Sequence, residues 1–293
     1  MDFNVSKCHT MSITRARQRC DTQYYLGNAC LSIVNSFTYL GIEISSDLRW
    51  NNHVAAVVSK ASRTLNFVRR NLYRCNSHIK ELSYITLVRP LLEYATASWD
   101  PYTACNIKDL EMVQRRAARF VGSDYRRTTS VTSLLDSLGW ISLQDRRRNA
   151  RLINFFKARM GFPGLLHLVS ELNRHSRFTR SASSSDIPTY LQLPARTDVY
   201  KFSFLPRTIV DWNSLDIGVR GLNSLDSFRK VLVGCRSAAT CYWFSFSRHS
   251  GTNGLRPIAG YTTEELKNSH YWMMNIEVCQ ITRGSHFSRR FAA

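Results

Sequence analysis

The spacing of apolar residues changes at Trp50, and the new spacing constrains what the rest of the chain can fold into. The apolar residues that follow are mostly three or four positions apart: Val54, Val57, Val58, Ala61, Leu65, Val68 and Leu72. This period places them on one face of a long helix and leaves polar residues on the other. Similar patterning predicts helices over 78–97, 107–121, 131–138, 143–160, 204–215 and 225–232.

Proline and glycine mark the ends and bends of these helices. Pro90 lies inside 78–97 and predicts a kink there, because proline removes an intrahelical hydrogen bond. Gly139 follows 131–138, and Gly161 follows 143–160. The middle of the chain is therefore expected to be a helical bundle, and the fold class is mainly α.

The residues before Trp50 have the character of short strands. β-branched and aromatic residues cluster in the runs 11–14, 23–25, 30–34 and 39–44, and Gly27-Asn28 separates two of these runs. A small N-terminal β-hairpin unit is therefore expected to precede the bundle.

Two later segments lack a helical pattern. The stretch 174–200 is rich in serine and contains two prolines, so we expect an exposed linker. The last sixty residues mix aromatics, glycine and charge without a clear period. The expected organisation is a hairpin unit at 1–50, a basic helical bundle at 51–173, the Ser/Pro linker at 174–200, a helical segment at 201–233 and a tail of uncertain structure at 234–293.

The charge of the chain favours a polyanionic partner. Forty Lys and Arg residues against twenty-one Asp and Glu give a formal net charge of +19. Such an excess attracts nucleic acid, although a basic protein without such a partner and one bound to an anionic membrane surface are alternatives. The candidate nucleic-acid-binding residues lie on three predicted helices or, for Arg74, just beyond the first: Lys60, Arg63, Arg69, Arg70, Arg74, Arg115, Arg116, Arg119, Arg146, Arg147, Arg148 and Arg151.

Arginine suits phosphate recognition because its planar guanidinium donates two parallel charge-assisted hydrogen bonds. The neighbouring aromatic residues Phe67, Tyr73 and Tyr125 are suited to stacking on bases or sugars. Any single arginine is equally explained as part of the polar face of an amphipathic helix. Three acid-poor faces together favour nucleic-acid binding.

Several kinds of chemistry have no motif in the sequence. No adjacent Asp-Asp pair is present, and the one adjacent acidic pair, Glu264-Glu265, follows two threonines as at a helix start. Cys235, Cys241, His249 and His270 do not have the spacing of a zinc site. No GxSxG, P-loop or HExxH motif occurs. We therefore expect no catalytic residue, no metal site and no cofactor in this chain.

The cysteine pattern and the lack of long apolar runs indicate where in the cell the protein is expected. The eight cysteines form no CxxC pair, which is typical of reduced intracellular thiols. The first ten residues lack the apolar core of a secretory signal, and no run of about 18 apolar residues occurs. An intracellular protein is expected, and the pattern leaves nucleus and cytoplasm open.

Several longer strings resemble one family. Phe37–Ile44, followed by Asp47–Val54, resembles the primer-grip region and following helix start of non-LTR (LINE-type) retrotransposon reverse transcriptases. The likeness continues through Leu65–Leu72, Tyr84–Ala95, Trp99–Tyr102, Leu110–Phe120, Leu138–Trp140 and Phe204–Leu215. It covers roughly residues 1–232.

The resemblance implies a role for each part of the chain. Residues 1–50 would be the tail of an α+β palm, in which Tyr39, Leu40 and Gly41 help to hold the primer 3′ end. The helices after Trp50 would form a thumb that grips an RNA template, an RNA–DNA hybrid or a duplex. The catalytic aspartates and any endonuclease domain of the family would precede Met1, so we expect this chain to be a fragment without nucleotidyl transfer. Mg²⁺ is expected only in the intact polymerase.

Two other functions remain open at this stage. The chain is alternatively a domesticated helical module that binds a protein or nucleic acid without any link to polymerisation. A third possibility is a polymerase whose catalytic half comes from another chain.

Overall fold

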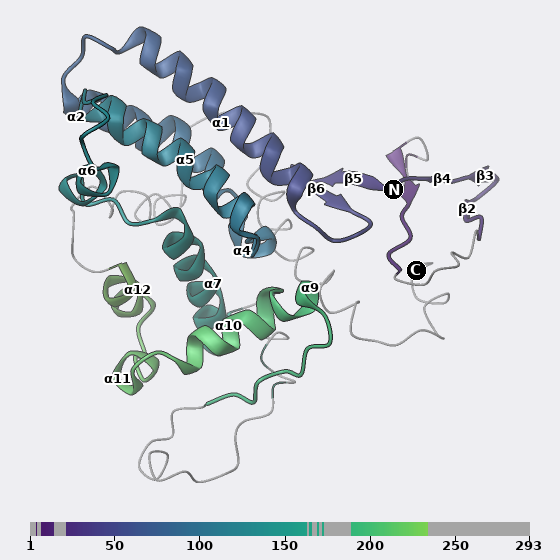
Figure 1. Cartoon of the computed structure of the whole chain (residues 1–293). Coiled ribbons are helices and arrows are strands. Elements are labelled where there is room, and N and C mark those ends of the chain that lie inside the picture. Colours follow the sequence, from purple (N-terminus) through teal and green to yellow (C-terminus); the bar gives the residue numbers. More distant parts are fainter. Residues whose placement is uncertain are drawn as a thin grey trace, which may run out of the picture. The chain divides into compact units, whose positions relative to one another are not determined.

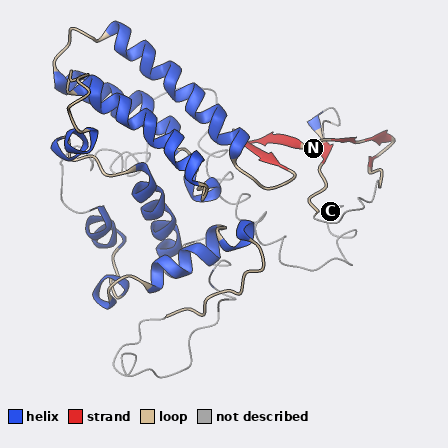
Figure 2. Cartoon of the chain, viewed as in Figure 1, coloured by secondary structure: helices blue, strands red, loops and turns tan. Residues whose placement is uncertain are grey.

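The computed structural model describes residues 4, 7–14, 22–162, 164–165, 169, 172 and 189–233 (Figure 1). These residues are mainly helical, as the apolar spacing predicts (Figure 2). The chain divides into two compact units. Unit 1 comprises residues 1–92 and 101–131, and unit 2 comprises residues 93–100 and 132–293. The division runs through the segment 51–173, which the sequence pattern presents as one bundle.

The strands of unit 1 form three separate two-stranded ladders. β1 (His9–Thr10) pairs in parallel with β4 (Ser32–Ile33). β2 (Tyr25–Leu26) pairs antiparallel with β3 (Ala29–Cys30), and β5 (Ser36–Tyr39) pairs antiparallel with β6 (Ile42–Ser45). The hairpin around Gly27-Asn28 therefore forms where the sequence pattern places a turn, whereas the expected run 39–44 is divided by the turn of a second hairpin. The run 11–14 contains no strand.

The β5–β6 hairpin is tied to the helix that follows it. Leu40 and Gly41 form its two-residue turn, and both have positive φ, the geometry that matches the twist of a tight hairpin. Ile42 is buried. The backbone N–H of Glu43 donates to Nδ1 of His53, at 3.2 Å, near the start of the next helix.

Two parallel helices form the centre of unit 1. α1 (Asn51–Asn71) packs along α5 (Ala104–Val121), and the two lie side by side in Figure 1. The amides of Asn51 and Asn106 are hydrogen-bonded at their first turns, and Arg69 lies over the Tyr125 ring at their other ends. The apolar faces meet in a core that includes Val54, Ala61, Leu65, Val68, Leu110, Val113, Ala117 and Phe120.

The expected single helix over 78–97 is wrong in detail, because it is broken twice. α2 (Ser77–Ser83) continues into the π-helical turn η2 (Tyr84–Val88) and then α3 (Arg89–Glu93). The N–H of Arg89 reaches the carbonyl of Tyr84, five residues back, so the chain widens immediately before Pro90. Ala95 then adopts a left-handed conformation, after which α4 (Thr96–Trp99) begins. Proline thus breaks the regular helix, as expected, but through a π-helical turn.

The remaining helices belong to unit 2, apart from the first residue of α6. They are α6 (Val131–Ser137), α7 (Leu143–Arg159), α9 (Asp198–Lys201), α10 (Phe204–Asn213), α11 (Ile217–Arg220) and α12 (Leu225–Val233). Ser142 caps α7 by accepting the N–H of Asp145, and Gly139 has the positive φ expected after α6. The predictions for α6, α7, α10 and α12 are confirmed to within two residues.

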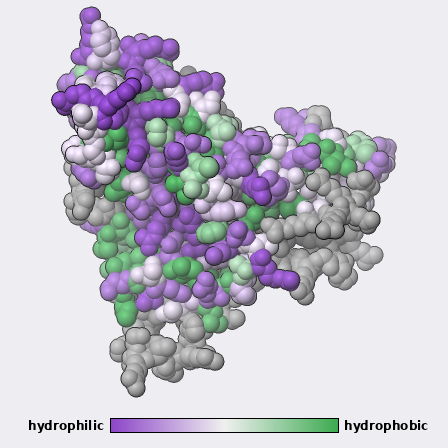
Figure 3. All heavy atoms as spheres, viewed as in Figure 1, coloured by the Kyte–Doolittle hydropathy of each residue, from purple (hydrophilic) through white to green (hydrophobic). Residues whose placement is uncertain are grey.

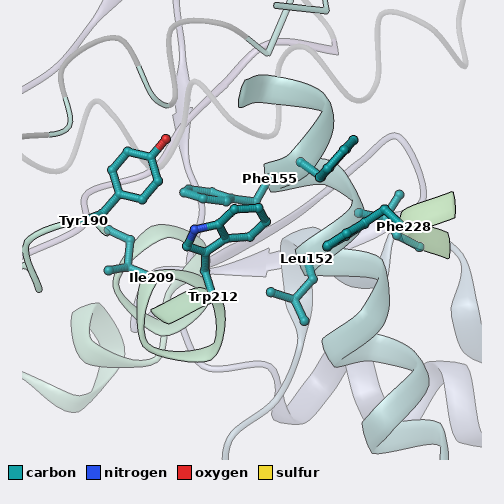
Figure 4. Packing of buried hydrophobic residues seen from close by; sticks show 8 residues of the cluster. Leu152, Phe155, Tyr190, Ile209, Trp212 and Phe228 are labelled. Atoms are coloured by element: carbon teal, nitrogen blue, oxygen red, sulfur yellow. The ribbon is translucent and has the colours of Figure 1, made fainter. Parts of the chain in front are cut away.

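An aromatic cluster fills the core of unit 2 (Figure 4). Phe155 and Phe156 of α7 pack against Trp212 of α10, and Phe228 of α12 stacks on Phe156 with ring centroids 4.3 Å apart. Tyr190 meets Phe155 edge to face. Tyr190 is buried and exchanges two backbone hydrogen bonds with the Asn213 amide.

The burial of Tyr190 corrects part of the linker prediction. The segment 174–200 was expected to be exposed, yet Tyr190 belongs to the core and residues 198–201 form α9. Residues 173–188 lie outside the described residues, as does the tail 234–293. Among the described helices, none combines the length and the apolar character needed to cross a membrane.

Candidate nucleic-acid interface

One face of α1 carries exposed cations around an exposed ring. Lys60, Arg63, Phe67 and Arg70 follow one another at steps of three, four and three, so they lie on one side of the helix, and we call them the α1 stripe. All four are exposed. No described residue forms an ion pair or a hydrogen bond with the charged groups of the three cations. Residues 51–80 contain no carboxylate, so the α1 stripe has none on its own helix.

The end of α1 brings arginine and tyrosine together. The guanidinium of Arg69 lies 5.6 Å from the ring centre of Tyr125, and that of Arg74 lies 5.3 Å from the ring centre of Tyr73. Nε of Arg74 also donates to the Tyr73 hydroxyl at 2.6 Å. Arg69 is half-buried and Arg74 is exposed. Both therefore stand at the surface beside exposed rings.

The three candidate arginines of α5 have two different roles. Arg115 and Arg116 are exposed, and no described carboxylate pairs with them. Arg119 is half-buried and donates to the backbone carbonyls of Asp124, Arg126 and Thr129. Arg119 therefore organises the loop after α5, whereas Arg115 and Arg116 can meet a phosphate.

The expected arginine face on α7 is wrong. Arg147 and Arg151 are 1% and 2% exposed, and both donate from Nε to the Asp100 carboxylate, at 2.8 and 2.9 Å. Arg146 makes a two-pronged ion pair with Glu93, and Arg148 lies 3.2 Å from Asp211. All four candidate arginines of α7 are thus engaged by carboxylates of unit 2.

The burial of α7 explains the error. Helix α7 has buried residues around most of its circumference, since it packs against α4, α10 and α12. A helix covered on several sides has little solvent-facing surface, so its charged side chains need internal partners. Those partners, Glu93, Asp100 and Asp211, are more than forty residues away along the chain, where a local pattern does not reveal them.

Arg207 of α10 joins the ion pairs of Arg147, Arg148 and Arg151, and the four arginines with their carboxylates form one internal cluster. The sequence pattern did not indicate a role for Arg207. Its Nη1 lies 3.1 Å from the Asp100 carboxylate. Burial lowers the pKa of Arg207, the positive charges of Arg151 and Arg147 lower it further, and Asp100 and Asp211 oppose this change. Four arginines, at 147, 148, 151 and 207, thus share two carboxylates. The cluster joins α7 and α10 to Asp100, which follows α4.

The structure adds two exposed arginines to the candidate surface of unit 1. Arg126 and Arg127 follow Tyr125 and are exposed. Arg126 pairs with Asp124 at 2.9 Å, and hydrogen bonds from Arg126 and Thr129 hold the pKa of Asp124 far below its usual value. The adjacent Tyr125-Arg126-Arg127 string is the signal by which sequence reasoning could have found them. Lys80, by contrast, is buried and donates to the Ser123 hydroxyl.

The primer-grip-like residues lie elsewhere on unit 1. Tyr39, Leu40 and Gly41 form the tip of the β5–β6 hairpin, which bonds to α1 at His53 near the start of the helix. Tyr73 and Tyr125 lie at the C-terminal end of α1, opposite to the hairpin, and the 21 residues of α1 span about 30 Å. The α1 stripe lies between the two. In the described part of the chain, no three His, Cys, Asp or Glu side chains gather as a metal site would require.

Comparisons with known proteins assign no function to this chain. No family model, curated protein or solved structure matches the chain significantly. The geometry of unit 1 therefore carries the functional argument.

Proposed function

We propose that the chain binds nucleic acid through unit 1, without strong sequence preference, and that it corresponds to the palm tail and thumb of the non-LTR retrotransposon reverse transcriptases that it resembles. The observation that supports binding is a set of exposed cations without described carboxylate partners: Lys60, Arg63, Arg70, Arg115 and Arg116. Helices of this kind offer charge along a phosphate backbone and no fixed arrangement for reading base edges.

The same residues set the expected strength of the salt effect. If all five cations neutralise phosphates, the logarithm of the affinity for duplex falls with the logarithm of salt concentration at a slope of about −4.5. Raising salt from 50 to 200 mM then weakens binding by roughly 500-fold. A protein that binds through apolar contact would show little of this dependence.

In this proposal the hairpin tip and the α1 stripe act on one substrate. Tyr39, Leu40 and Gly41 would lie at the primer end, as the resemblance implies, and the α1 stripe would contact the backbone of the template–primer helix. Both belong to unit 1, and the hairpin is hydrogen-bonded to α1 at His53, so the hairpin and the α1 stripe are linked through one helix. Nucleotidyl transfer is not part of the proposed function.

The test compares two triple variants of the full chain with equal change in charge. Lys60→Gln/Arg63→Gln/Arg70→Gln neutralises the α1 stripe, and Arg196→Gln/Lys201→Gln/Lys230→Gln neutralises three exposed cations of unit 2. Titration of a labelled RNA–DNA hybrid at several salt concentrations should show the slope reduced by about 2.7 in the first variant and little changed in the second. Equal reductions would mean that net charge, and not this surface, governs binding.

A second candidate function is supported by a different feature of unit 1. Ile79, Leu82 and Leu87 are exposed apolar side chains of α2 and η2. Exposed apolar residues in one region favour docking of a protein partner. Under this alternative, partner binding survives neutralisation of Arg69, Arg70, Arg115 and Arg116, whereas nucleic-acid binding does not.

A further inference from the structure

Two exposed tyrosines stand at the same end of unit 1. Tyr73 and Tyr125 follow the C-terminal ends of α1 and α5, and the two residues are 60% and 56% exposed. Because α1 and α5 run parallel, the segments that follow them leave unit 1 at one end. We call Arg69, Tyr73, Arg74, Tyr125, Arg126 and Arg127 the tyrosine–arginine end. Hydrophilic side chains cover the far end of α1 in Figure 3, at the upper left.

Each tyrosine is paired with a guanidinium. Arg69 lies over the Tyr125 ring and Arg74 over the Tyr73 ring. A cation placed over one face of a ring holds the ring in place and adds positive charge beside it. Each tyrosine residue is more than half exposed, so a flat ligand has access to it.

Hydrogen bonds hold the loop that carries Tyr125. Arg119 donates to three carbonyls of the loop, at Asp124, Arg126 and Thr129. The Asp124 carboxylate accepts the backbone N–H of Arg126 at 3.0 Å and the Thr129 hydroxyl at 2.7 Å. Tyr125 is therefore presented by an ordered loop, which reduces the entropy lost when a ligand stacks on the ring.

The charge at this end is strongly positive. Arg127 is exposed and has no described partner, and Arg70 of the α1 stripe lies one residue from Arg69. Asp124 is the carboxylate of this loop, and its charge is already matched by Arg126. Phosphate groups are the ligands that such unpaired guanidinium groups bind best in two-pronged geometry.

We propose that the tyrosine–arginine end, together with the adjacent Arg70 of the α1 stripe, binds single-stranded nucleic acid, with bases stacked on Tyr73 and Tyr125 and phosphates bound by Arg70 and Arg127. This inference rests on the proposed function, because the α1 stripe supplies further phosphate contacts. The bases of a duplex are stacked within the helix and do not reach surface rings, whereas the bases of a single strand do. The two rings therefore add affinity for single strands alone.

The test uses the full chain and removes the rings without changing the charge. Tyr73→Ala/Tyr125→Ala is compared with Tyr73→Phe/Tyr125→Phe, which keeps both rings, and with Tyr24→Ala/Tyr25→Ala. Tyr24 and Tyr25 are matched controls, since they are 52% and 60% exposed elsewhere in unit 1. The probes are labelled oligothymidylate, an abasic strand of the same length and a duplex of the same length, followed by fluorescence anisotropy.

Stacking on the two rings predicts which probes lose affinity in each variant. Each stacked base is worth about 5- to 150-fold in affinity, so Tyr73→Ala/Tyr125→Ala should weaken oligothymidylate binding by at least roughly 25-fold. Duplex and abasic-strand binding should change by less than about twofold, and both control variants should bind as the original chain does. The original chain should bind the abasic strand about as weakly as the alanine variant binds oligothymidylate.

The failures of the two proposals are distinguishable. Equal losses on single strand and duplex, or an equal loss in Tyr24→Ala/Tyr25→Ala, would overturn the stacking site while leaving electrostatic binding by the α1 stripe intact. Absence of salt-dependent binding to every probe would overturn the proposed function as well. Binding of polyglutamate that depends on the tyrosines would show a protein-directed surface and contradict the single-strand site.

Discussion

Neutralising Asp100 should destabilise unit 2 far more than removing one of the arginines that surround it. The Asp100 side chain is 4% exposed and has three guanidinium partners, on Arg147, Arg151 and Arg207. The substitution Asp100→Asn keeps the shape and removes the charge. Arg147 and Arg207 then lose their carboxylate partner, while Arg151 keeps Asp211. Breaking a buried ion pair in this way costs about 3–5 kcal/mol.

The substitution Arg147→Met gives the opposite expectation. The four arginines of the cluster exceed its two carboxylates, and Nη1 and Nη2 of Arg147 are buried without a partner among the described residues. Methionine occupies a similar length and removes two unsatisfied groups and one surplus charge. Asp100 retains Arg151 and Arg207. We expect a change in the free energy of unfolding of less than about 1 kcal/mol.

Urea unfolding of the full chain, followed by tryptophan fluorescence, measures both changes. Trp99 and Trp212 are fully buried in unit 2 and report on its unfolding. Arg148→Met serves as a control, since that side chain is 38% exposed and pairs at the rim of the cluster. Equal destabilisation by Arg147→Met and Asp100→Asn would show that the surplus of arginines over carboxylates does not determine the stability of the cluster, and would refute this prediction.

Three further predictions concern unit 1 and the chemistry of the chain. Burial lowers the pKa of His53 to about 4, so the folded state favours neutral histidine. The free energy of unfolding is therefore highest above pH 6.5 and falls by no more than about 3 kcal/mol as the pH drops towards 4. His53→Gln should remove this pH dependence in urea unfolding measured at several pH values. Arg119→Gln removes the donors to the loop at 124–129, so hydrogen exchange of those amides should accelerate while α1 keeps its protection. Primer extension by the purified chain with Mg²⁺ or Mn²⁺ should give no product, and a recovered product would contradict the proposal that this chain binds nucleic acid without nucleotidyl transfer.

The elements that sequence predicts best are those fixed by neighbours along the chain. The period from Val54 to Leu72 is local, and α1 forms where that period requires it. The hairpin turn at Gly27 and the cap of α7 by Ser142 depend on residues only one to three positions away, so both were predictable. Pro90 indicated a break, but the π-helical form of η2 depends on packing around Tyr84 and Val88, which the sequence pattern does not show.

The candidate site was predictable on α1 and not on α7 for the same reason. Charged residues look alike in a sequence whether their partners are water or distant carboxylates. Lys60 and Arg63 face solvent, whereas Arg147 and Arg151 meet Asp100, 47 and 51 residues away. Distinguishing these cases requires knowing that α7 is covered on several sides. Tyr190 was missed similarly, because its partner Asn213 is 23 residues away.

The parallel course of α1 and α5 has a consequence for how this chain can be divided. Two parallel neighbours need a long connection between them, and here that connection passes through residues 93–100, which belong to unit 2. The chain therefore passes from one unit to the other three times, and a single cut cannot separate them into independent modules. A segment beginning at residue 132 would carry Arg147, Arg151 and Arg207 but lack Asp100 and Glu93. Insertions, deletions or recombination between residues 92 and 101 would therefore disturb both units at once.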